Sequence, residues 1–212
     1  MFLLRAMQPV KAMLHRFYVV TIILILLIPG CIESQSVIGD KQEDIPLRLT
    51  FKADTLDRVE DQGATFDLKE ELENGPVLLL WVGSSCSGCH EWTNLIRESL
   101  EDGSLNESTL SVVSIHGWSG IEGSEEVMNA FGLDSNDSSY APWKIVMGKK
   151  NTPALTYFSE QDSGYGLYEA YGNPSTPTLQ LIGDNGIKMW QSKNYWANST
   201  ILDEIWDTAS KL

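Results

Sequence analysis

The chain is short of cysteines and of basic residues, and both shortages narrow its possible functions. It has 3 cysteines, too few to build a fold from disulfides, so each is expected to have a chemical role. Lys and Arg total 15 against 29 Asp and Glu, which gives a net charge of -14. Such an acidic chain lacks the basic surface that binds phosphates, so we do not expect it to bind nucleic acid.

The composition is that of a folded chain of ordinary size. Hydrophobic residues make up 42% and charged residues 21%, a balance that excludes wholesale disorder. A length of 212 residues favours one domain with room for a short additional segment.

Residues 1–30 are expected to be a targeting segment. Three basic residues accompany an uncharged apolar run from Phe17 to Ile28. As a helix this run would be roughly 18 Å long, shorter than the ~30 Å hydrocarbon core of a bilayer, so a signal segment is favoured over a full span. The basic residues on its N-terminal side predict that the rest of the chain lies outside the cytoplasmic membrane.

The end of this segment, Ile28-Pro29-Gly30-Cys31, resembles a lipobox, with Pro29 in place of the usual small residue. We expect cleavage before Cys31 and lipid on its sulfur, and an uncleaved signal anchor is the alternative. Either outcome leaves the rest of the chain tethered at the outer face of the cytoplasmic membrane. Residues 31–46 are largely polar and are expected to be a flexible tether.

Residues 47–212 are expected to form an α/β domain. The continuous apolar run Pro76–Val82 is typical of a central strand covered on both faces. A helical pattern that ends at Gly103 and a strand at Leu110–Ile115 follow it, which predicts a βαβ unit with parallel strands. Residues 134–166 place aromatic residues between polar turns and are expected to be an insertion over the core.

The last part of the chain predicts a hairpin and a helix. Thr178–Ile182 and Ile187–Trp190 are short apolar runs on either side of a turn-rich loop, as in a β-hairpin. The apolar residues from Ile201 to Ala209 recur at the spacing of one helical face.

The motif Cys86-Ser87-Gly88-Cys89 carries the chemistry. It follows the apolar strand and opens a helix, so Cys86 is expected at a helix N-terminus, where free N–H groups favour a thiolate. Cys89 lies one turn later, close enough to attack a mixed disulfide formed by Cys86. The motif therefore predicts thiol–disulfide exchange, with Cys86 attacking and Cys89 resolving.

Other interpretations of the motif stay open. A structural zinc ion needs about four ligands, and no second cysteine pair exists. With His90 the motif becomes C-x-x-C-H, which matches covalent haem attachment, although an apolar strand precedes it. A binding or scaffold module with a static disulfide is a further alternative. His90 is a candidate modulator of the thiolate, with a plain surface residue as the alternative. His116 follows a predicted strand, and we expect it to pack in the core rather than to approach the site.

Taken together, these residues resemble the thioredoxin superfamily and, within it, exported, membrane-tethered TlpA/ResA-like thiol-disulfide oxidoreductases. The likeness covers roughly Leu47 to Leu212. The matching segments are Thr65–Leu68, Gly75–Trp81, Cys86–Cys89, Tyr171–Thr178 and Gly183–Gly186.

The resemblance implies a thioredoxin-like fold, a central mixed β-sheet flanked by helices, with the inserted segment before the half that carries a cis-proline. The residue matching that cis-proline is Pro177, which faces the disulfide in the family, and Thr176 would present backbone groups to an extended substrate. Ser85 stands where family members commonly carry Trp, and Leu80 stands where cytoplasmic thioredoxins carry a buried acid.

The resemblance also implies partners. They are exported client proteins with thiols or disulfides and a second protein that recycles the cysteine pair. No organic cofactor and no metal is implied. The dipeptide Ser87-Gly88 between the cysteines leaves both directions of electron flow, reduction and oxidation of clients, open.

Overall fold

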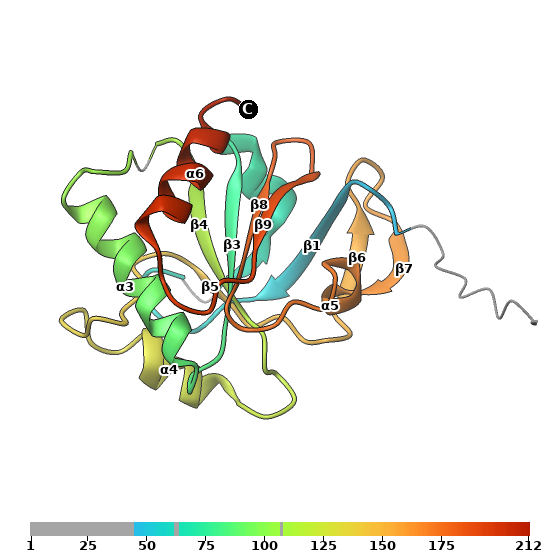
Figure 1. The fold of residues 1–212 in the computed structure, drawn as a ribbon. Coiled ribbons are helices and arrows are strands. Elements are labelled where there is room, and N and C mark those ends of the chain that lie inside the picture. The colour runs from blue at the N-terminus through green and yellow to red at the C-terminus, as the bar shows by residue number, and fades with distance from the viewer. Residues whose placement is uncertain (1–44, 62–63, 107) are drawn as a thin grey trace, which may run out of the picture. The chain divides into compact units, whose positions relative to one another are not determined.

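The central strand of the fold is β3 (Val77–Val82), and all of its residues are buried, as its apolar sequence predicts. The computed structural model describes residues 45–61, 64–106 and 108–212 (Figure 1). The predicted signal segment, the lipid site at Cys31 and the tether as far as Asp44 lie outside these residues. None of the helices in the described ranges has the length and hydropathy that a bilayer crossing requires.

Five strands form a mixed central sheet. Their order is β5 (Ile145–Val146), β4 (Ser111–His116), β3, β8 (Thr178–Ile182) and β9 (Lys188–Ser192). Strands β3, β4 and β5 run parallel, and β8 and β9 are antiparallel to their neighbours. The predicted βαβ unit, the predicted hairpin and the predicted mixed central sheet are all present.

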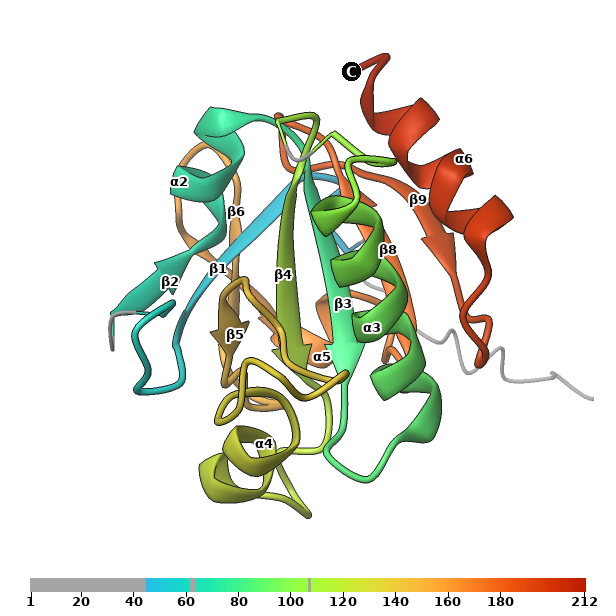
Figure 2. The ribbon, with the colours of Figure 1, turned by 90° about the vertical axis from the view of Figure 1, so that its left-hand side faces the viewer.

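Helices cover one face of this sheet. Helix α3 (Ser87–Glu101) lies in front of β3 in Figure 2, and α6 (Ser199–Ala209) lies beside it. Helix α4 (Ser124–Phe131) follows β4. Buried side chains from these helices form one core cluster with alternate residues of β3, and the two cysteines of the motif belong to that cluster. The helix face is therefore also the face of the cysteine pair.

A second sheet covers the other face, on the right in Figure 1. Its four antiparallel strands have the order β2 (Thr65–Asp67), β1 (Leu49–Asp54), β6 (Pro153–Thr156) and β7 (Asp162–Gly166). The short elements that accompany it are α2 (Leu68–Glu71), the 3₁₀ turn η1 (Leu72–Asn74) and α5 (Leu167–Ala170). The segment 134–166 thus supplies strands to both sheets, because it contains β5, β6 and β7.

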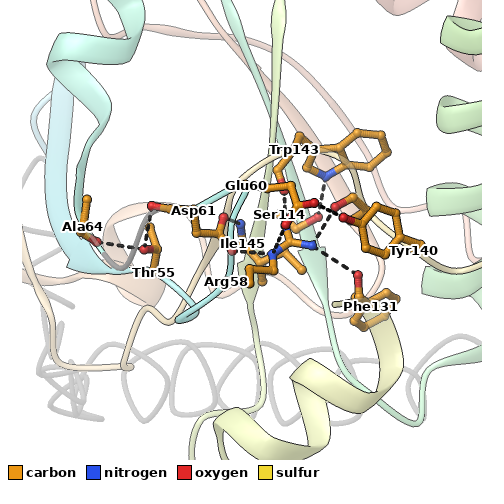
Figure 3. A network of polar contacts seen from close by, with 11 residues as sticks. Thr55, Arg58, Glu60, Asp61, Ala64, Ser114, Phe131, Tyr140, Trp143 and Ile145 are labelled. Atoms are coloured by element: carbon orange, nitrogen blue, oxygen red, sulfur yellow. Dashed lines mark hydrogen bonds and ion pairs between the residues drawn. The ribbon is translucent and has the colours of Figure 1, made fainter. Parts of the chain in front are cut away.

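A buried arginine holds the loop between α4 and β5. Arg58 has a side chain only 5% exposed, and it pairs with the fully buried carboxylate of Asp61 (Figure 3). The Arg58 guanidinium also donates to the carbonyls of Ala141 and Trp143, and Asp61 accepts the backbone N–H of Ile145 at 2.8 Å. These bonds join two segments that are about eighty residues apart in the chain.

Candidate active site

Cys86 and Cys89 form a disulfide at the first turn of α3. Cys86 is the N-cap residue of this helix, and its Sγ accepts the backbone N–H of Cys89 at 3.2 Å. Cys86 is 2% exposed and Cys89 is 0% exposed. The motif therefore sits where a helix terminus favours negative charge on sulfur, and the surrounding core covers the oxidised pair.

The loop before Cys86 is held from two sides. The backbone N–H groups of Ser84 and Ser85 donate to the carboxylate of Glu122, at 2.7 and 3.3 Å. The carbonyl of Ser84 lies 2.7 Å from Nε2 of His90 on α3. Glu122 belongs to no motif and lies 38 and 37 residues beyond Ser84 and Ser85, so sequence reasoning missed it.

His90 is half-buried rather than a free surface residue. Its Nδ1 lies 2.6 Å from the hydroxyl of Ser139, its Nε2 bonds the carbonyl of Ser84, and its ring stacks on Phe131 at 4.8 Å between centroids. Both ring nitrogens are therefore engaged, and neither is free to serve as an axial ligand of iron. The haem interpretation of C-x-x-C-H does not fit this arrangement.

Glu122 also contacts His116, the last residue of β4. Nε2 of His116 lies 3.4 Å from the Glu122 carboxylate, and the two side chains are 1% and 7% exposed. Burial lowers the pKa of His116 below its ordinary value, although Glu122 and Glu126 act to raise it. Burial acts to raise the pKa of Glu122, but hydrogen bonds from Ser84, Ser85 and His116 outweigh it and the pKa is lowered. At neutral pH the imidazole is thus neutral and the carboxylate ionised.

The buried neutral imidazole makes the fold sensitive to mild acid. Because the pKa of His116 is lowered from 6.5, the unfolded chain binds a proton below about pH 6.5 that the folded chain does not. The free energy of unfolding should therefore decrease as the pH is lowered through this range. This group contributes at most about 1.4 kcal/mol per pH unit to the decrease. Urea unfolding at about pH 7.5 and 5.5 measures the loss, and His116→Gln should reduce it. Equal losses in both proteins would contradict this assignment.

Thr176 and Pro177 lie at the same end of the sheet as the cysteine loop. The peptide bond between them is cis. The next residue, Thr178, is the register partner of Trp81 near the end of β3, and the loop to Cys86 begins directly after that strand. A side chain on Gly117, after β4, would meet the Thr176 methyl group at 2.7 Å. The structure thus brings the two predicted parts of the site, the cysteine loop and the proline loop, to the same end of the central sheet.

The loop between β9 and α6 is seated on the cysteine motif. The indole N–H of Trp92 on α3 donates to the carbonyl of Asn194 at 2.9 Å. A Cβ atom on Gly88 would lie 2.1 Å from the backbone oxygen of Tyr195. Tyr195 and Trp196 in this loop remain 44% and 58% exposed. The residue before Cys89 must therefore be small because another backbone occupies the space.

Gly88→Ala is expected to destabilise the protein although alanine favours helices. The methyl group would displace the backbone at Tyr195, and overpacking of this kind costs about 1–3 kcal/mol. Gly120→Ala is the matched control, because a Cβ there meets nothing within 4 Å, and it should change stability by less than about 0.5 kcal/mol. Thermal and urea unfolding measure both. A stabilised Gly88→Ala protein would show that the loop yields freely.

Comparisons with known proteins support the fold and leave the family unassigned. No protein-family model matches the sequence, and a search of curated proteins finds no match. Solved structures do match. A putative thioredoxin from Neisseria meningitidis is 19% identical with a TM-score of 0.52, over 78% of this chain and 91% of that one. The mitochondrial 2-Cys peroxiredoxin of Plasmodium falciparum is 12% identical with a TM-score of 0.53, over 77% and 92%.

A third solved structure, MTB dsbF in mixed oxidized and reduced forms, is 13% identical with a TM-score of 0.50, over 77% of this chain and 98% of that one. These likenesses establish a thioredoxin-like fold. Together with the Cys86–Cys89 disulfide, they place a C-x-x-C pair at the start of α3 in such a fold.

Proposed function

We propose that this protein is a thiol-disulfide oxidoreductase that exchanges disulfides with other proteins through Cys86 and Cys89. The observation that carries the proposal is the disulfide at the N-terminus of α3, directly after the central strand of a thioredoxin-like fold. In client reduction the Cys86 thiolate attacks a client disulfide, and one client thiolate leaves. Cys89 then attacks Sγ of Cys86, the second client sulfur leaves, and the intramolecular disulfide forms again.

The position of Thr176 and Pro177 supports a role in client binding. They lie at the end of the central sheet where the cysteine loop also lies. In the proposed mechanism the backbone of Thr176 positions an extended client segment so that its sulfur reaches Cys86.

Turnover distinguishes this function from a static disulfide. The purified protein should catalyse reduction of a disulfide-bonded model protein by dithiothreitol, and Cys86→Ser should abolish the acceleration. A scaffold module with a fixed disulfide would give no acceleration above dithiothreitol alone. That result would overturn the proposal.

We further propose that the protein acts on exported clients from the outer face of the cytoplasmic membrane, as the TlpA/ResA-like resemblance implies. The support is in the sequence alone, in the apolar run that ends at Ile28 and in Cys31. Intact mass of the membrane form should show loss of residues 1–30 and added lipid. A protein that still begins at Met1 with a free Cys31 thiol would contradict lipidation and favour the signal anchor.

A further inference from the structure

The loop that delivers Cys86 is bonded to a buried carboxylate. Glu122 accepts the backbone N–H groups of the two residues that precede Cys86, and its side chain is 7% exposed. Through its carbonyl, the same loop is bonded to His90. Two hydrogen bonds therefore hold the Glu122 carboxylate against this loop, and the bond to His90 holds the loop against α3.

The charge of Glu122 is not neutralised by its neighbours. Among the ion pairs of the described residues, Glu122 meets only His116, which is buried and neutral at neutral pH. The carboxylate of Glu126 on α4 also acts on His116, and His90 on α3 bonds the carbonyl of Ser84 in the loop that Glu122 holds. The Glu122 carboxylate, with its side chain only 7% exposed, thus places a negative charge against the backbone that leads into Cys86.

Two electrostatic effects then act on the Cys86 thiolate. The N–H groups at the start of α3 stabilise it, and one of them already contacts Sγ of Cys86. The carboxylate of Glu122, which is bonded to the N–H of the residue directly before Cys86, destabilises it, because a like charge nearby disfavours ionisation. A stabilised thiolate favours the reduced pair and makes its disulfide a strong oxidant. A group that destabilises the thiolate therefore favours the disulfide and makes the reduced pair a better reductant.

We propose that Glu122 offsets the helix at Cys86 and thereby makes the pair a reductase of client disulfides. This inference rests on the proposed exchange function. In each turnover the client S–S bond breaks, the Cys86–Cys89 S–S bond forms, and two electrons pass to the client. The protons of the dithiol pass to the two client thiols. An external protein dithiol then reduces Cys86–Cys89 and is itself oxidised to a disulfide.

The test compares Glu122→Gln with wild type in two measurements. The pH midpoint of Cys86 alkylation should fall by about one unit, a tenfold change, because one nearby charge is removed. At about pH 9, where Cys86 is largely ionised, the equilibrium constant with glutathione should move by about tenfold toward the dithiol, equivalent to about 30 mV. Glu122→Asp keeps the charge and should stay close to wild type in both.

Glu125→Gln is the matched control. It removes the same charge from an exposed residue three positions along the chain, and it should leave both measurements unchanged. An unchanged midpoint in Glu122→Gln, or equal shifts in Glu122→Gln and Glu125→Gln, would overturn the inference. A wild-type pair that does not exchange with glutathione at all would overturn the proposed function instead.

The wild-type protein provides a further test, which does not depend on whether any variant folds. Cysteine pKa values in C-x-x-C motifs range from about 3.5 in a strong oxidant to about 7 in a reductase. With Glu122 opposing the helix, the alkylation midpoint of wild-type Cys86 should lie at about 7 or above. A midpoint clearly below about 7, or a pair that oxidises client dithiols but fails to reduce client disulfides, would overturn the reductase assignment.

Discussion

Cys89→Ser is expected to accumulate mixed disulfides with client proteins, and Cys86→Ser is expected to trap almost none. The reason is the order of the two attacks. Cys86 caps α3 and forms the first bond to the client, whereas Cys89 is fully buried and acts only on Sγ of Cys86. Without Cys89 the mixed disulfide has no intramolecular route to resolution, so trapped species should exceed those of Cys86→Ser by more than about tenfold.

Non-reducing electrophoresis and mass spectrometry of captured adducts measure this difference. Both variants should also lose catalytic turnover, because attack and resolution are needed in sequence. The double variant, with serine at both positions, is the control for adsorbed protein. Trapping by Cys86→Ser rather than by Cys89→Ser would reverse the assigned roles. A similar small loss of stability in both variants, with no trapping, would indicate a static disulfide, since only a short loop is closed.

Asp61→Ala is expected to destabilise the fold by about 3–5 kcal/mol. The substitution would leave the guanidinium of Arg58 buried without its carboxylate partner. It would also leave the backbone N–H of Ile145, at the start of β5, without its acceptor. Loss of one partner of a buried ion pair is costly because the remaining charge stays out of water.

An exposed ion pair supplies the control for this experiment. Lys211 and Asp207 are paired with side chains 67% and 65% exposed, so Asp207→Ala should cost no more than about 1 kcal/mol. Urea unfolding of the three proteins gives the comparison. Similar losses for both variants would mean that the Arg58 network does not hold the α4–β5 loop.

The local parts of the fold could be predicted from the sequence. The apolar run in β3, the helical spacing in α6 and the C-x-x-C motif each show within a few residues what structure they form. Predicting that the cysteine pair and the proline loop belong to one site needed the family resemblance as well. The reason is that 86 residues separate Cys89 from Thr176, and neither Thr176 nor Pro177 has a reactive side chain that would mark a site.

The second sheet and the support of the site could not be predicted in this way. Strand β1 pairs with β6 about a hundred residues later, and β5 has only 2 residues, so neither pairing leaves a periodic signal. Glu122 is one of several acidic residues near the start of α4, and only the folded chain shows that it alone reaches the N–H groups of Ser84 and Ser85. Long-range contacts of single side chains have no local pattern.

The strands contributed by residues 134–166 make this segment indispensable to solubility. It supplies the outer neighbour of β4 in one sheet, and in the other it supplies β6 beside β1 and β7 beyond β6. A shortened protein without it would present unpaired backbone along β4 and β1, next to apolar side chains such as Phe51 that are now fully buried. Open edges of this kind recruit further chains, so the shortened protein would aggregate even with its cysteine motif intact.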